Sequence, residues 1–227
     1  MLRRSETKEI AVWDKATRVF HWALVIMVAV CWVTSEAGGA LFWTHLISGY
    51  GILLLVLFRI AWGIVGGRHA RFTDFVRGRS AVIAHARQLL KLNPPRHIGH
   101  NPLGGWMIMA LLSALLVMVI TGLFAAHDGD AGPYAVLVSQ SVADAISEIH
   151  ETLFNLLLFL IALHVAGVLI DSLLGRENLV RALITGTKRV AIDNPEDDAP
   201  EPSRLRLAVA LGLAVIGLAL VISGGPG

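Results

Sequence analysis

Long apolar runs alternate with short polar segments along the chain. Five windows contain about the 20 mostly apolar residues that a helix needs to cross a hydrocarbon layer of about 30 Å. They cover residues 18–35, 45–65, 104–126, 151–174 and 205–223. The strong alternation of a β-barrel strand is absent from them. The pattern predicts an all-α integral membrane protein: a four-helix transmembrane bundle over residues 10–190 and a fifth C-terminal transmembrane helix over residues 205–223.

The polar segments carry their own predictions. The acidic, proline-containing stretch "VAIDNPEDDAPEPSR" indicates a linker over residues 191–204 between the bundle and the fifth helix. The stretch "SAVIAHARQLLKL" places apolar side chains on one helical face, which favours a short helix at the surface of anionic lipid. The stretch "GRENLVRALITGTKR" has a similar pattern. The first apolar window begins late and has no convincing small-residue cleavage site, so we expect a retained helix.

Among the polar segments, only alternate ones carry positive charge. Lys and Arg occur in the N-terminal segment, between the second and third windows and after the fourth, but residues 35–44 and 126–149 contain none. The positive-inside rule then places the N-terminus in the cytoplasm and the two Lys/Arg-free segments outside. Only 16% of the residues are charged and 55% are hydrophobic, against about 25% charged in typical soluble domains. We expect membrane lipid as a partner and no nucleic acid.

The nine histidines fall into two groups. Five lie in polar segments and are expected at the surface or the membrane interface: His69, His85, His97, His100 and His127. The other four lie within or at the ends of apolar windows, where an ionisable side chain is costly and indicates a functional site.

Helix geometry sorts those four histidines by depth. Fourteen residues turn through about 1400°, about 40° short of four turns, so His150 and His164 project from nearly one face about 21 Å apart. His45 lies at the level of His150, and His21 lies at the level of His164. The sequence therefore predicts an outer pair, His45 and His150, and an inner pair, His21 and His164.

Two imidazoles that face one another across a bundle can bind a haem iron from both sides. Such bis-histidine ligation leaves no open position and favours electron transfer over oxygen chemistry. Zinc fits less well because it usually takes three or four protein ligands. A lone cysteine, Cys31, excludes an intramolecular disulfide and the Cys-x-x-Cys-His attachment of covalent haem.

Residues near the inner pair suit a haem as well. Arg59 lies fourteen residues after His45, at the depth of the inner pair, where a haem propionate would be a suitable partner. Contact with lipid phosphate is the alternative. Three glycines of the second window, Gly49, Gly51 and Gly63, could let a flat macrocycle approach or could aid helix packing.

Four segments resemble the bacterial cytochrome b561 and Ni,Fe-hydrogenase b-type cytochrome family over about residues 10–190. They are "VWDKATRVFHW", "THLISGYGILLLVLFRIAWG", "GHNPLGG" and "HETLFNLLLFLIALH". The resemblance implies two haem b groups per chain, with His21 and His164 on the inner haem and His45 and His150 on the outer one. It also implies electron transfer between a periplasmic-side partner and the membrane quinone pool.

Three functions remain open at this point. The first is a dihaem electron conduit, a cytochrome subunit rather than a free-standing enzyme, with a soluble cytochrome c or a dehydrogenase as its periplasmic redox partner. The second is a superoxide:quinone oxidoreductase, which the acidic, Lys/Arg-free outer segments disfavour because the substrate is an anion. The third is a non-redox transporter or assembly subunit whose histidines bind a metal or protons.

Overall fold

Five long helices make up most of the structure, a computed structural model that describes residues 7–127, 129–191 and 201–225. They are α1 (Lys15–Glu36), α2 (Phe42–Val65), α5 (Pro102–Phe124), α6 (Gln140–Gly175) and α8 (Arg204–Gly224). Each is long and apolar enough to cross a membrane. The predicted all-α membrane bundle with an additional C-terminal helix is confirmed.

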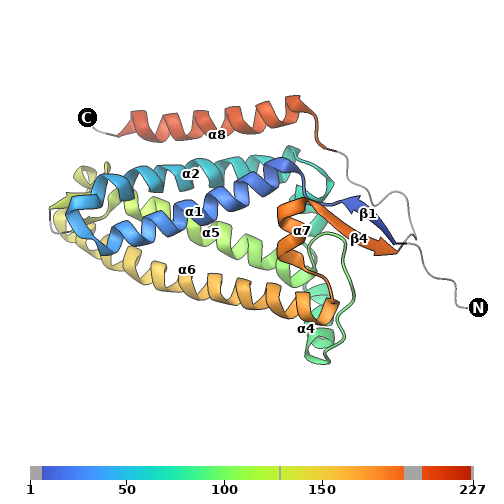
Figure 1. The fold of residues 1–227 in the computed structure, drawn as a ribbon. Coiled ribbons are helices and arrows are strands. Elements are labelled where there is room, and N and C mark those ends of the chain that lie inside the picture. The colour runs from blue at the N-terminus through green and yellow to red at the C-terminus, as the bar shows by residue number, and fades with distance from the viewer. Residues whose placement is uncertain (1–6, 128, 192–200, 226–227) are drawn as a thin grey trace, which may run out of the picture.

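The helices pack as two pairs joined through α2. Helix α1 packs on α2 and α5 packs on α6, with a smaller contact between α2 and α5 (Figure 1). Helix α8 lies along the outer side of α2, where Ala210 and Ala214 are fully buried. Small side chains at this seam allow close approach of the two helices. Within the described residues, α6 is not among the helices that pack closely on α1 or α2, so the side chains between them have room.

The two ends of the bundle differ in charge and in cover. One end, here called the basic end, carries the short helices η2 (Arg68–Ala70), α3 (Phe72–Phe75), α4 (Arg79–Leu90) and α7 (Leu179–Thr185) and the strands β1 (Thr7–Ala11) and β4 (Thr187–Ala191). The strands pair antiparallel, with Thr7 opposite Ala191 and Ala11 opposite Thr187. The other end, here called the acidic end, carries η1 (Gly38–Leu41), β2 (Ala126–His127), β3 (Asp130–Ala131) and η3 (Ala135–Leu137).

Side-chain caps fix where the helices next to the basic end begin. The Asp14 carboxylate accepts a hydrogen bond from the Thr17 amide at 2.7 Å, and the Asn101 side chain accepts one from the Gly104 amide at 2.6 Å. Each satisfies an amide that has no partner in the first turn of a helix, and Pro102 follows Asn101 where a missing N–H costs nothing. These caps set the depth at which α1 and α5 enter the bundle.

Two features differ from the sequence prediction. Helix α6 begins at Gln140 rather than 151, and its 36 residues extend about 54 Å, well beyond a hydrocarbon layer of about 30 Å. The extra turns are amphipathic, with Ala143 and Ser147 buried, so a search for apolar windows does not detect them. The β1–β4 sheet was also not predicted, because each strand is short and its partner lies far away in sequence.

The polar segments follow the prediction in part. The short helices expected in residues 80–92 and 175–189 are present as α4 and α7. Of the linker expected over residues 191–204, residues 192–200 lie outside the described part of the chain.

Candidate functional site: two histidine pairs

The four membrane histidines meet in two layers. The His45 and His150 ring centroids are 6.5 Å apart, and those of His21 and His164 are also 6.5 Å apart. Both His150 and His164 come from α6, whereas His21 comes from α1 and His45 from the start of α2. Each pair therefore spans the space between α6 and the α1–α2 layer.

The spacing of each pair fits one iron atom between two rings. A metal–imidazole bond of about 2 Å places two nitrogens on opposite sides of one metal about 4 Å apart, and half a ring on each side adds roughly 2 Å more. The residues present therefore fit a bis-histidine haem at both levels. In the described part of the chain, no cluster of three or more His, Cys, Asp or Glu side chains could hold a metal ion.

Hydrogen bonds orient both rings of the outer pair. His45 Nδ1 lies 3.0 Å from the backbone carbonyl oxygen of Cys31, which can only accept, so this nitrogen carries the proton. His150 Nδ1 lies 2.9 Å from the Thr121 hydroxyl oxygen. That hydroxyl also lies 3.0 Å from the Val117 carbonyl oxygen and 2.9 Å from that of Met118, either of which can accept its proton. A metal on His150 Nε2 would leave the ring proton on Nδ1, which would then donate to the Thr121 oxygen.

A cavity of about 370 Å³ opens beside the outer pair at the acidic end. Its walls include both histidines, Gly122, Asp130 and Glu151. A Cβ atom on Gly122 would lie 3.0 Å from His150 Cε1, so the glycine leaves room for the ring. The two carboxylates make the surroundings of the outer pair acidic, and no Lys or Arg lines the cavity.

The inner pair has fewer polar contacts. His21 Nδ1 is buried and has no hydrogen-bond partner among the described residues. The His21 ring instead contacts the edge of the Trp22 ring at a centroid distance of 5.2 Å. The sequence alone does not distinguish the two layers, because the groups that orient the outer pair are a backbone carbonyl and one threonine.

Arg59 lies in the half of α2 that leads to the basic end, and its level at the inner pair stays a prediction. Its side chain is 3% exposed, and Nη1 has no hydrogen-bond partner in the described residues. The guanidinium lies over the rings of Phe72 and Phe75, at 5.2 and 5.6 Å from their centroids. The acidic side chain that interacts with it electrostatically is Asp14, whose oxygens already accept from Thr17 and Trp62. A buried guanidinium with a free N–H group can bind a further anion.

The three glycines of α2 differ in their surroundings. A Cβ atom would clash with the Phe72 ring at Gly63 and would lie 3.1 Å from Met27 Sδ at Gly51. At Gly49, one turn after His45, it would meet nothing within 4 Å. Of the three, only Gly49 leaves open space next to a ligand candidate.

The prediction that the histidines of the basic end are surface residues is wrong for His85. This side chain is 3% exposed, and its ring centroid lies 5.1 Å from that of His97. His100 packs between Trp13 and Phe75, with centroid distances of 4.5 and 4.7 Å. His85 is buried because α4 packs against α5. It lies three residues after Val82 and four before Leu89, so it shares the apolar face of the helix. That spacing was the sequence signal for its burial. His127 is exposed, as predicted.

Burial keeps His85, His97 and His100 neutral near pH 7. Burial and then the positive charge of Arg59 lower the pKa of His100 from its ordinary value of 6.5 to about 3. Burial also lowers the pKa of His85, and the pKa of His97 is lowered by burial and by the neighbouring His85. A nearby cavity of about 260 Å³ is lined by two arginines, Arg68 and Arg77, and by Asp74.

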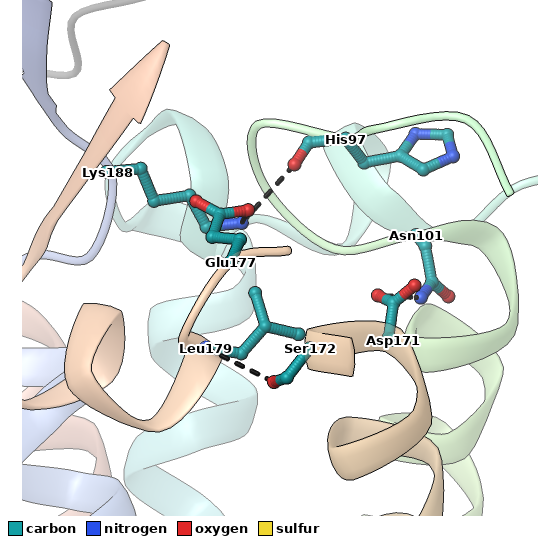
Figure 2. Close-up of polar contacts among 7 residues, drawn as sticks. All are labelled: His97, Asn101, Asp171, Ser172, Glu177, Leu179 and Lys188. Carbon is teal, nitrogen blue, oxygen red and sulfur yellow. Dashed lines mark hydrogen bonds and ion pairs between the residues drawn. The ribbon is translucent and has the colours of Figure 1, made fainter. Parts of the chain in front are cut away.

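A set of polar contacts ties this end of the bundle together (Figure 2). The buried Lys188 ammonium donates to the His97 carbonyl oxygen and to the Glu177 carboxylate, each at 3.3 Å. The Asn101 side chain donates to Asp171 on α6 at 2.9 Å. These contacts join β4 and the end of α6 to the loop before α5.

Comparison with known proteins shows what the chain is similar to. The model of the prokaryotic cytochrome b561 family matches residues 12–186. A "Probable Ni/Fe-hydrogenase B-type cytochrome subunit" of Cupriavidus necator is 26% identical, covering 79% of this chain and 86% of the relative. Proteins of the same description from Azotobacter vinelandii and Rhizobium leguminosarum bv. viciae are 24% and 22% identical over 82% and 81% of this chain, and 91% and 90% of their own lengths. No solved structure matches significantly. Helix α8 lies beyond the family match.

Proposed function

The chain belongs to the prokaryotic cytochrome b561 family, and from that premise we propose that it is a dihaem conduit between a periplasmic redox partner and the membrane quinone pool. As a multi-pass membrane b-type cytochrome it acts in electron transfer. The observation that carries the two-haem proposal is the pair of histidine layers, each with a ring spacing of 6.5 Å.

Each haem b would supply a one-electron carrier, because its iron cycles between the ferrous and ferric states. His45 and His150 would bind the iron of the outer haem, and His21 and His164 that of the inner haem. With two imidazoles per iron, no position is left for a small-molecule substrate, so the residues favour electron transfer. Arg59 would neutralise a propionate of the inner haem with its free Nη1. The two ligands on α6 are about 21 Å apart along the helix axis, so the pairs connect opposite halves of the bundle.

The charge of the two ends supports an orientation and a class of partner. The positive-inside rule favours the basic end in the cytoplasm and the acidic end in the periplasm of a bacterial inner membrane. Carboxylates beside the outer pair favour a partner that presents positive charge around its own redox centre. A soluble cytochrome c or a dehydrogenase fits this description. The names of the relatives add a hydrogenase to the candidate partners. The quinone would exchange electrons with the inner haem.

The two alternative functions receive less support. Superoxide is an anion, and Asp130 and Glu151 line the cavity beside the outer pair, so electrostatics opposes its approach. A transporter or assembly subunit would need no pair of rings at a spacing suited to an iron atom. The family membership likewise favours electron transfer.

An absorption spectrum and a haem assay test this proposal. We expect the purified chain to show the reduced-minus-oxidised bands of low-spin haem b and a pyridine haemochrome value of two haems per chain. A quinol analogue should reduce both haems in membranes. Fully loaded protein with one haem contradicts the two-haem proposal, and protein without haem bands points to the transporter or assembly role.

A further inference from the structure

Helix α5 supplies none of the four histidines, yet it makes the closest polar contact to one of them. Thr121 Oγ1 lies 2.9 Å from His150 Nδ1. The same hydroxyl is 2.9 Å from the Met118 carbonyl oxygen and 3.0 Å from that of Val117. Both carbonyls can accept the hydroxyl proton. With iron on His150 Nε2 the ring proton would lie on Nδ1, so the imidazole would donate to the hydroxyl oxygen.

The residue next to Thr121 completes the contact. Gly122 has no side chain, and a Cβ atom there would lie 3.0 Å from His150 Cε1 and 3.5 Å from Nδ1. The Thr-Gly dipeptide of α5 therefore both holds the ring and makes room for it. In the opposite ring, His45 Nδ1 is held by the Cys31 carbonyl at 3.0 Å. With each Nδ1 tied to a different helix, the two ring planes are set 77° apart.

We propose that Thr121 is a positioning residue for the outer haem: its hydroxyl fixes the plane and tautomer of His150 and increases electron donation from that ligand to iron. The inference rests on the proposed function, because it requires a haem between His45 and His150. A metal-bound histidine that donates its second N–H becomes a stronger ligand. Stronger donation stabilises ferric over ferrous iron, so this contact lowers the reduction potential of the outer haem.

Thr121→Val removes the hydroxyl and keeps the shape of the side chain, whereas Thr121→Ser keeps the hydroxyl. We expect Thr121→Val to raise the reduction potential of one of the two haems and to leave the other unchanged, and Thr121→Ser to resemble the wild type. Ser113→Ala is the matched control, because it also removes a hydroxyl from α5 but at an exposed position. It should move neither potential.

Electron paramagnetic resonance gives a second readout that a change in packing alone would not produce. Low-spin haems with nearly perpendicular imidazole planes give a signal dominated by one large g value, and nearly parallel planes give a rhombic signal. The outer haem of the wild type should show the large-g signal, and Thr121→Val should shift it toward the rhombic form. Loss of the outer haem from Thr121→Val with retention in Thr121→Ser would support the same role.

The outcomes separate this inference from the proposed function. Wild-type protein that binds no haem overturns the proposed function and this inference with it. Wild-type protein that binds two haems, with unchanged potentials and g values in Thr121→Val, overturns the role of Thr121 alone. A shift of equal size in Thr121→Ser also overturns it, because the hydroxyl would then not be the cause.

Discussion

The two histidine pairs share a ring spacing of 6.5 Å but differ in what holds the rings. In the outer pair each Nδ1 has an oxygen partner, one from the Cys31 backbone and one from the Thr121 side chain. In the inner pair His21 Nδ1 has none among the described residues. Spacing is therefore a property of the helices, whereas ring orientation depends on individual neighbours. The two haems would share their ligand type but not their ligand strength.

The surroundings of the two pairs also differ in charge. Asp130 and Glu151 line the cavity beside the outer pair. Helical spacing predicts the buried Arg59 at the level of the inner pair, and Arg68 and Arg77 line a cavity at the basic end. Positive charge raises a haem reduction potential and negative charge lowers it, because the ferric form carries the additional charge. Both differences act in the same direction and favour the inner haem as the better electron acceptor.

The comparison first requires the two ends to lie on opposite sides of the membrane, which is an all-or-none effect. Reporter fusions made after Asp130 and within residues 72–96 should be active in opposite compartments, with the first in the periplasm. Fusions at both places that report the same side would remove the basis for calling one pair outer and the other inner.

The next largest effect is expected at Arg59. Arg59→Met removes a buried charge, and unit charges about 8 Å apart interact by about 2 kcal/mol at an effective dielectric constant of 20, which corresponds to roughly 90 mV for one electron. The potential of the inner haem should therefore fall by tens of millivolts or more, and Arg59→Lys should restore much of it. The outer haem is the internal control in the same titration. A fall in the reduction potential of the outer haem alone would show that Arg59 acts on the outer pair and not on the inner one.

Ranking the wild-type potentials sharpens the comparison further. Redox titration should resolve two components, with the higher-potential one belonging to the inner haem. His150→Ala should then remove the lower-potential component, and His164→Ala should remove the higher one. The opposite assignment would show that burial or propionate placement outweighs the charges of the two ends.

The smallest expected effect concerns the stability of the basic end. Burial lowers the pKa of His100 to about 3 in the folded chain. In the unfolded chain the same imidazole binds a proton below about pH 6.5. Stability from this group is full above that pH and falls as the pH drops toward 3, by up to about 1.4 kcal/mol per pH unit. The thermal midpoint in detergent should decrease between pH 7.5 and 5, and less so in His100→Gln. Equal slopes in the wild type and in His100→Gln would contradict the assignment.

The sequence was informative wherever one regular helix determined the answer. Apolar windows located the five long helices, and the spacing of fourteen residues between His150 and His164 placed one histidine in each layer. The sequence did not predict the start of α6 at Gln140, because the helix begins with amphipathic turns. It also did not predict the burial of His85, which depends on how α4 packs on α5.

Contacts between segments that are far apart in the sequence could not be predicted from it either. The pairing of β1 with β4 and the ion pair of Lys188 with Glu177 require knowledge of which loops meet at the basic end. The hydrogen bond between His150 and Thr121 joins two helices whose relative rotation cannot be read from either sequence pattern. Threonine is common in membrane helices, where its hydroxyl often bonds the preceding turn, so nothing in the sequence singles out Thr121.

The central claim is that the four histidines bind two haems in the pairs His45–His150 and His21–His164. Haem content and redox titration of the four single His→Ala variants test it most directly. We expect each variant to retain one haem, with His45→Ala and His150→Ala losing the same redox component and His21→Ala and His164→Ala losing the other. The claim is contradicted if His45→Ala and His150→Ala lose different components, or if all four variants still bind two haems.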